Sequence, residues 1–164
     1  MYKAIEIAYW FLYRNYTERM EKTAANDEFD VYEGLTHLKL QKLLYNAQGV
    51  SLALRDKPIF EEPLEAWLHG PVVRNVYDTF LVFRGAPIIV PVTEETTRIV
   101  EKIDGDSSAH EVLEFVYENF SIYTAWQLRE MSHAKNGPWY KTSANSTIDN
   151  ELIKEYFKKE VVEE

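Results

Sequence analysis

LTHLKLQKLLYNAQGVSLALRDKPIFEEPLEAWLHGPVVRNVYDTF, residues 35–80, is the stretch that decides the fold. Thr36 can begin a helix there, because its hydroxyl can accept a hydrogen bond from an amide group of the first turn. Pro58 ends that helix, since a proline disfavours helical geometry in the residue before it. The core-facing stripe at helical spacing consists of Leu40, Leu43, Leu44, Ala47, Ser51 and Leu54. A separate polar strip, with members three and four residues apart, consists of Lys39, Lys42 and Asn46.

The segment after this helix is apolar but lacks clean alternation. Pro58 and Pro63 exclude a regular central strand, so we expect a short edge hairpin or an extended segment around residues 58–70. Gly70 allows a positive φ, and Pro71 fixes φ at the start of the next element. We expect Pro71 to lie in the first turn of a helix. The apolar residues that recur there at helical spacing are Val72, Val73, Val76, Tyr77, Phe80 and Leu81.

Residues 2–22 predict a helix that is buried on two sides. One apolar side consists of Ile5, Ala8, Tyr9, Leu12, Tyr16 and Met20. Trp10, Phe11 and Tyr13 widen the apolar surface beyond one stripe; the alternative is an exposed aromatic face for a partner. Residues 23–34 lose the periodicity and gather Asn, Asp and Gly, so they predict a loop.

The C-terminal half predicts short helices with recognisable starts. Thr93 precedes two glutamates, which complement a helix N-terminus. Capping-box spacing occurs at Ser108 with Glu111 and again at Thr124 with Gln127. These signals predict separate helices in this part of the chain.

A last helix is expected after Ser146 or Thr147. Its inward-facing residues are Ile148, Leu152, Tyr156 and Phe157. We find no internal repeat, low-complexity segment or second-domain linker. The sequence therefore predicts a mainly α fold: a single compact multi-helix domain over residues 1–164, with a small extended or hairpin element around residues 58–70.

Composition narrows the class of partner. The 164 residues carry a formal charge of -9, with 27 acidic and 18 basic residues. A uniformly acidic domain repels phosphate, which disfavours nucleic acid and makes a protein with a positive surface the more natural partner. There is no cysteine, which fits a reducing compartment. No apolar run approaches the roughly 18 residues of a membrane span, and no signal-peptide core follows the N-terminus. We expect a cytoplasmic protein without a membrane partner.

Known catalytic motifs are missing from the sequence. The four histidines are His37, His69, His110 and His133; they form no HExxH pair, and none has a second His or Cys at metal-ligand spacing. The serine motifs GxSxG and SxxK and a glycine-rich phosphate loop are missing too. We therefore expect no enzymatic activity, no catalytic residue, no metal and no cofactor.

Two of the histidines have a distinctive setting. His69 and His133 each lie beside a turn and a tryptophan, whereas His37 and His110 fall in or before first helical turns, where we expect them at the surface. One interpretation is that each imidazole hydrogen-bonds a backbone group and fixes its turn. The other is that His69 and His133 are polar contacts in a recognition groove.

Three ordered blocks of sequence resemble one protein family. The first is LQKLLYNAQG at residues 40–49, and the second combines EAW at 65–67 with GPV at 70–72. The third consists of Leu128, Ser132-His133 and Pro138-Trp139. The blocks and their spacing resemble the Panacea domain, the antitoxin SocA-like family that is also called GepA-like or phage-associated. The family often has a second aromatic after Tyr45, where this chain has Asn46.

This resemblance implies an antitoxin of a toxin–antitoxin system, often encoded on prophages or mobile elements, that binds its cognate toxin directly. It implies two alternatives: an adaptor that delivers the toxin to a ClpXP-type protease, and a DNA-binding regulator of its own operon. An enzyme acting on a small molecule would require a deep polar pocket containing both His69 and His133. The 4 Trp, 11 Tyr and 8 Phe agree with a protein-binding role.

We predict a partner-binding surface near the turn at Gly70-Pro71. Its residues are Lys42, Tyr45, Trp67, His69, Gly70, Pro71, Ser132 and His133. The alternative is that these motif residues form the structural skeleton, and that toxin specificity lies on other helix faces. If Lys42→Ala or His69→Ala leaves folding and toxin neutralisation intact, the predicted surface is wrong.

Overall fold

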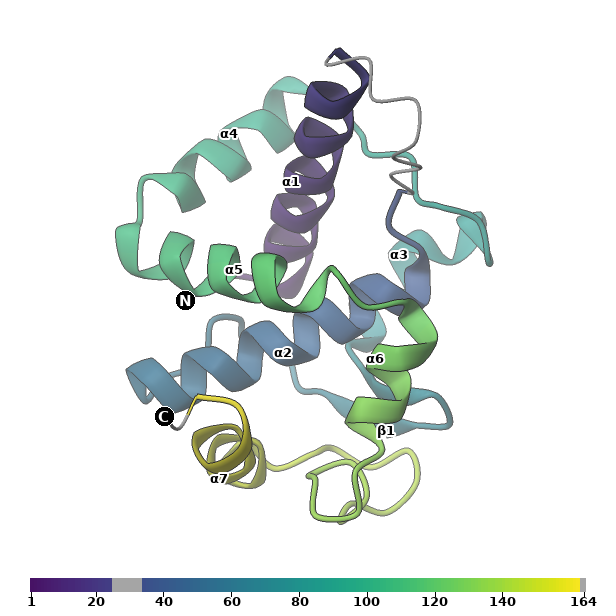
Figure 1. Ribbon diagram of the computed structural model, residues 1–164, viewed down its shortest axis with the longest axis vertical. Coiled ribbons are helices and arrows are strands. Elements are labelled where there is room, and N and C mark those ends of the chain that lie inside the picture. Colours follow the sequence, from purple (N-terminus) through teal and green to yellow (C-terminus); the bar gives the residue numbers. More distant parts are fainter. Residues whose placement is uncertain (25–33, 163–164) are drawn as a thin grey trace.

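The computed structural model describes residues 1–24 and 34–162, and these share one hydrophobic core (Figure 1). The α-helices are α1 (Ala4–Ala24), α2 (His37–Arg55), α3 (Arg74–Phe80), α4 (Glu94–Asp104), α5 (Ser107–Phe120), α6 (Ala125–Ser132) and α7 (Asn150–Glu160). A short 3-10 helix, η1 (Leu81–Phe83), follows α3. The strands β1 (Glu65–Trp67) and β2 (Gly70–Val72) form an antiparallel hairpin. The predicted mainly α fold with a small hairpin is confirmed. The loop predicted over residues 23–34 lies, apart from its ends, outside the described residues.

Helix α2 is the centre of the molecule. It contacts α1, α5, α6, α7 and the hairpin, which lie around it in Figure 1. Every residue from Leu40 to Leu52 is buried. The predicted polar strip is therefore wrong at Lys42, which is 0% exposed, and at Asn46, which is 7% exposed. The reason is tertiary: the hairpin, α6 and α7 cover the sides of α2 that helical spacing alone would leave to solvent.

Two buried glutamines explain how polar residues fit inside this core. The Gln48 side chain accepts a hydrogen bond from the backbone N–H of Ile59 at 2.9 Å and donates one to the carbonyl of Phe60 at 3.1 Å. Two turns earlier on the same helix, Gln41 accepts from the N–H of Val73 at 2.8 Å and donates to its carbonyl at 3.2 Å. Buried backbone groups need such partners. Helix α2 therefore fixes the chain on both sides of the hairpin.

We expect Gln48→Leu to lower the free energy of unfolding by about 2 kcal/mol, because backbone groups of Ile59 and Phe60 would be left buried without their partner. Chemical denaturation measures the change. The exposed Gln127→Leu is a control for the added apolar surface, although it also removes one half of the α6 capping box. Equal stability of the parent and Gln48→Leu would show that water or other groups satisfy these atoms.

The hairpin is also fixed from its other edge. Strand β1 is flanked by residues 145–148, where the N–H of Asn145 donates to the carbonyl of Ala66 at 2.7 Å and the N–H of Ile148 donates to that of Leu64 at 2.8 Å. The predicted start of α7 directly after Ser146 or Thr147 is wrong, because this pairing holds residues 145–148 beside β1. Helix α7 starts instead at Asn150, with Asp149 as its cap.

Most of the other helix starts agree with the predicted signals. The Thr36 hydroxyl accepts from the N–H of Lys39, and capping boxes begin α4 at Thr93 and α6 at Thr124. The predicted box at Ser108 is wrong, because the Asp106 carboxylate accepts from the N–H of Ala109 and begins α5 earlier. Pro71 does not begin a helix either; it pairs with Ala66 in the hairpin, and α3 begins at Arg74.

The apolar face of α1 is rotated relative to the predicted one. Its fully buried residues are Ala4, Ile7, Ala8 and Phe11. Tyr16 and Met20, which were predicted to face inward, are exposed, and so are Leu54 on α2 and Leu81 after α3. Trp10 and Leu12 are buried beside the main face, which confirms a helix buried on two sides.

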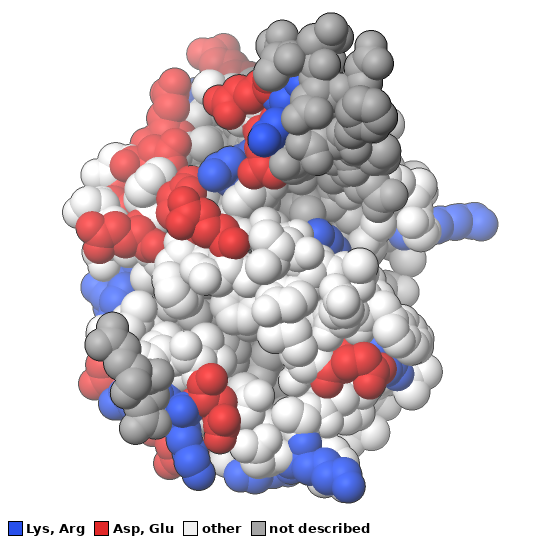
Figure 2. Space-filling model, in the orientation of Figure 1, with Lys and Arg blue, Asp and Glu red and all other residues white. Residues whose placement is uncertain are grey.

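Charge is distributed unevenly over the surface. In Figure 2, acidic side chains gather at the upper left, over α4 and α5, whereas the lower right, over α6, is mostly uncharged apart from an acidic patch with basic atoms beside it. Within residues 1–24 and 34–162, no helix has the length and apolarity that crossing a membrane requires.

Candidate partner-binding site

Three elements meet at Gly70. This residue has φ +111°, which L side chains rarely adopt, so the predicted positive φ is confirmed. A Cβ at this position would lie 2.6 Å from the Ser132 hydroxyl oxygen of α6 and 2.7 Å from Lys42 Cε of α2. The close approach of the hairpin, α2 and α6 therefore depends on a residue without a side chain.

Lys42 lies beneath this contact. Its ammonium group donates a hydrogen bond to the carbonyl of Pro71 at 2.9 Å. Burial lowers the pKa of Lys42 to about 7, and the nearby Arg129 guanidinium contributes in the same direction. A lysine with this pKa is charged in only part of the population at neutral pH. Its contact with Pro71 joins α2 to β2.

Trp139 holds the next part of the site together. Its indole N–H donates to the carbonyl of Trp67 at 2.7 Å, and its ring stacks on His133 with centroids 3.7 Å apart and planes 3° apart. Within the described part of the chain, the buried Nε2 of His133 has no hydrogen-bond partner. Burial lowers the pKa of His133, and the Arg129 guanidinium contributes in the same direction. The indole of Trp139, rather than the imidazole of His133, makes the contact to the backbone.

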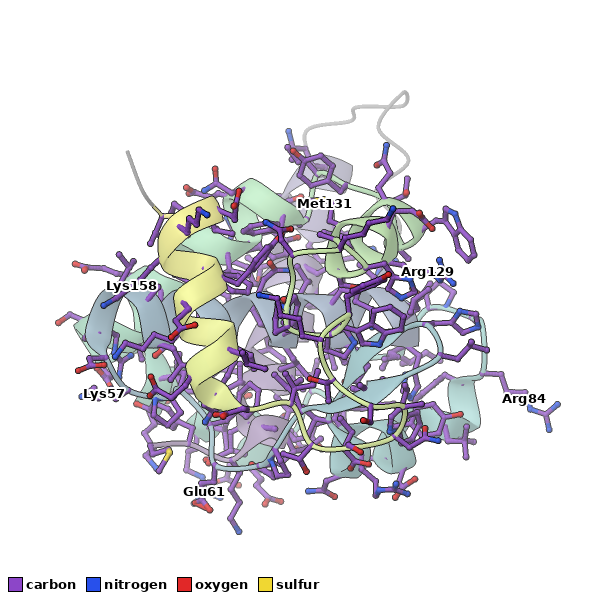
Figure 3. The ribbon with its side chains drawn as sticks, turned by 90° about the horizontal axis from the view of Figure 1, so that it is seen from below. Lys57, Glu61, Arg84, Arg129, Met131 and Lys158 are labelled. Carbon is purple, nitrogen blue, oxygen red and sulfur yellow. The ribbon has the colours of Figure 1, made fainter. Side chains whose placement is uncertain are left out.

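The imidazole of His69, like that of His133, contacts a side chain and, among the residues that the structure describes, does not hydrogen-bond the backbone of its turn. Its Nδ1 accepts a hydrogen bond from Arg129 Nε at 3.1 Å. Arg129 also forms an ion pair with Glu130 at 2.7 Å, and its guanidinium lies 4.3 Å from the ring centroid of Trp126. In Figure 3, Arg129 and Met131 extend from α6, while Lys57 and Lys158 lie at the other side of the view.

Arg129 and Trp126 were missed by the sequence analysis. The signal was present: the capping box places both on α6, and a spacing of three residues puts them on neighbouring positions of a helix surface. What the sequence could not supply was the contact to His69, which is 60 residues away along the chain.

Tyr45 lies apart from these residues. Its ring packs edge-on against Phe157 of α7, with centroids 5.2 Å apart. Burial raises the pKa of Tyr45, and among the described residues its hydroxyl has no hydrogen-bond partner. Tyr45 therefore belongs to the packing of α7 on α2.

The predicted residues divide by exposure. Those that are buried are Lys42, Tyr45, Gly70, Pro71 and Ser132. Trp67 and His133 are half-buried, and His69 is exposed. The contacts through Gly70, Trp139 and Arg129 bring together all of the predicted residues except Tyr45. That these residues bind a partner stays a prediction.

Neither described cavity is lined by His69 or His133. The larger, of about 810 Å³, lies between α1, the start of α2 and the end of α5; the smaller, of about 170 Å³, lies beside α7. The parts of the chain that the structure describes contain no group of three or more His, Asp or Glu placed to hold a metal ion. The Ser132 hydroxyl donates to the carbonyl of Arg129 at 2.7 Å. The Ser132 hydroxyl is therefore bonded to the backbone of its own helix.

Comparison with known proteins covers this same region. The model of the family described as Antitoxin SocA-like, Panacea domain, matches residues 40–140, more than half of the chain and a span that includes α2 from Leu40 onward, the hairpin and α6. Antitoxin SocA of Caulobacter vibrioides (strain NA1000 / CB15N) is 34% identical over 109 residues, which cover 64% of this chain and 58% of the relative's length. No solved structure matches. The chain belongs to the antitoxin SocA-like Panacea domain family.

Proposed function

We propose that this protein is an antitoxin that neutralises a cognate toxin by binding it directly. The observation that carries the proposal is the match of residues 40–140 to a family of SocA-like antitoxins. The matched relative is itself an antitoxin, and the chain spans 58% of its length. Membership in this family favours a binding protein over an enzyme.

The toxin-binding surface in this proposal lies at the hairpin turn and α6. Trp126 is 57% exposed, His69 is exposed, and Trp67 is half-buried. Aromatic residues of this kind are common anchors of protein interfaces. The other predicted residues have a supporting role, since Lys42 fixes β2 and Gly70 allows α6 to approach.

Growth rescue tests the proposal. The gene adjoining the one for this chain is expressed from an inducible promoter, with and without this protein, and the two proteins are then co-purified. We expect the neighbour to stop growth, this protein to restore it, and the two to form a stable complex.

The other outcomes separate the alternatives. If growth is rescued without a stable complex, and the rescue is lost in a strain that lacks ClpX, the protein delivers the toxin to a protease. If the rescue accompanies a fall in toxin transcript, the protein represses the operon. Rescue without a complex that depends on neither would indicate enzymatic reversal of the damage. Each of these outcomes would contradict neutralisation by binding, as would a toxin that remains active in the complex.

A further inference from the structure

One contact between α6 and the hairpin turn depends on protonation. His69 Nδ1 accepts a hydrogen bond from Arg129 Nε at 3.1 Å, and His69 is exposed, so its imidazole can exchange protons with solvent. An arginine side chain in a protein is always protonated and can only donate, so the imidazole must offer a lone pair at Nδ1. The contact therefore exists only while His69 is neutral and carries its proton on Nε2.

Protonation of His69 removes this contact and also opposes it. In the imidazolium form both ring nitrogens carry protons, so Nδ1 can no longer accept a hydrogen bond. The positive imidazolium then lies beside the positive Arg129 guanidinium, and like charges repel. Histidine side chains change charge between about pH 5 and pH 8. Acidification through this range is therefore expected to separate the His69 ring from Arg129.

Two carboxylates on the elements around the turn already have partners. On α6, Glu130 forms an ion pair with Arg129 at 2.7 Å. On β1, Glu65 accepts two hydrogen bonds from the guanidinium of Arg74, at 3.0 and 3.2 Å. In the described part of the chain, neither carboxylate forms a hydrogen bond or an ion pair with His69. Each of them neutralises a guanidinium instead.

The other titratable groups near the turn gain positive charge on acidification. Burial is the main reason why the pKa of His133 is lowered, and three basic neighbours act in the same direction: Arg129, Lys42 and His69. Glu130 acts against them. Lys42 of α2, whose pKa burial lowers to about 7, takes up its proton in the same range. Acidification therefore adds positive charge beside Arg129, and the experiment must separate Lys42 from His69.

The hydrogen bond from Arg129 joins the two elements that carry exposed apolar side chains. The Arg129 guanidinium lies 4.3 Å from the ring centroid of Trp126, and the His69 and Trp126 rings are 6.3 Å apart. Trp126 is 57% exposed, and Leu68, which precedes His69 in the turn, is 75% exposed. Loss of the hydrogen bond therefore frees Trp126 relative to the turn.

We propose that His69 makes toxin recognition sensitive to pH: the neutral imidazole holds Arg129 and Trp126 in the binding arrangement, and the protonated imidazole releases them and weakens binding. This inference rests on the proposed function and adds a regulation to it. The contact itself is present without the toxin, so it can be tested separately.

Nitrogen NMR of the full chain tests the contact. Between about pH 8 and pH 5, we expect the Arg129 Nε–H and Trp126 indole signals to shift together with the titration of His69, which should carry its proton on Nε2 at the upper limit. His69→Asn should abolish these shifts, because the asparagine oxygen lies close to the position of Nδ1 and can accept at every pH. The matched control is His110→Gln, a histidine of α5 that pairs with Asp104 and whose loss should leave the shifts unchanged.

Calorimetry with the purified product of the adjoining gene tests the consequence for binding. For the parent, we expect the dissociation constant to rise about two- to tenfold between about pH 8 and pH 5, because that is the contribution of one hydrogen bond. The toxin can titrate too, so the decisive quantity is the difference between the parent and His69→Asn, which should lack this rise. Lys42→Met should retain it. Circular dichroism checks that each protein is folded at both limits.

The outcomes distinguish this inference from the proposed function. Equal pH dependence of the parent and His69→Asn would overturn the inference and leave neutralisation by binding intact, as would a proton on Nδ1 of His69 at the upper pH limit. A pH dependence that is lost in Lys42→Met but kept in His69→Asn would assign it to the buried lysine and contradict the role of His69. No binding by the parent at either pH would contradict the proposed function and the pH-sensitive recognition together.

Discussion

Gly70→Ala is expected to lower the free energy of unfolding by about 2–6 kcal/mol. The φ of +111° at Gly70 would strain an alanine, at a cost of about 1–3 kcal/mol. The new methyl would also lie 2.6 Å from the Ser132 hydroxyl and 2.7 Å from Lys42 Cε, both in buried side chains, and overpacking of this kind costs about 1–3 kcal/mol more. Chemical denaturation with far-ultraviolet circular dichroism measures the change.

Gly85 provides the matched control. An added Cβ there would meet nothing within 4 Å, so Gly85→Ala should leave stability unchanged to within about 0.5 kcal/mol. Because Gly70 joins the hairpin to α6, Gly70→Ala should also weaken toxin binding. Equal stabilities of the two variants would contradict the close approach of α2, β2 and α6.

The pH dependence of stability should reveal the burial of Lys42. Its pKa falls from 10.5 to about 7 in the folded protein, mainly because burial disfavours the charged form. Below pH 7 both the folded and the unfolded states carry the proton, and the folded state bears the full cost of a buried charge. Above pH 7 the folded state loses the proton first, so the unfolded state binds more protons and stability rises with pH.

We therefore expect the parent to gain about 4 kcal/mol between about pH 7 and pH 10 relative to Lys42→Met, in which this group cannot titrate. Each pH unit in that interval contributes about 1.4 kcal/mol. Denaturation curves of both proteins across the interval measure the difference. Lys158→Met, at an exposed lysine of α7, is the control for loss of a positive charge. A difference between parent and Lys42→Met that does not change with pH would show that Lys42 remains charged in the folded protein.

Local signals in the sequence predicted the elements well. Thr36, Thr93 and Thr124 cap helices where their spacing indicates, because capping involves residues three apart in the chain. Pro58 and Pro63 correctly limited residues 58–70 to a small hairpin or extended segment. The error at Ser108 was local too, since Asp106 competes for the same turn.

Tertiary contacts explain what the sequence did not predict. Helical spacing indicated a polar strip at Lys42 and Asn46, but the partners that bury it come from the hairpin, α6 and α7. Gln41 and Gln48 resemble surface residues in the sequence, and their role requires the backbone of the segments that flank the hairpin. The site shows the same limit: His69 was identified from its turn, whereas Arg129 becomes recognisable only through its contact with His69.

Direct binding is the central claim, and it can be measured on purified proteins. This chain and the product of the adjoining gene are mixed and analysed by size-exclusion chromatography with light scattering. We expect a single peak whose mass corresponds to a complex of the two, in which the toxin is inactive. Two separate peaks from proteins that still show growth rescue in cells would contradict neutralisation by direct binding.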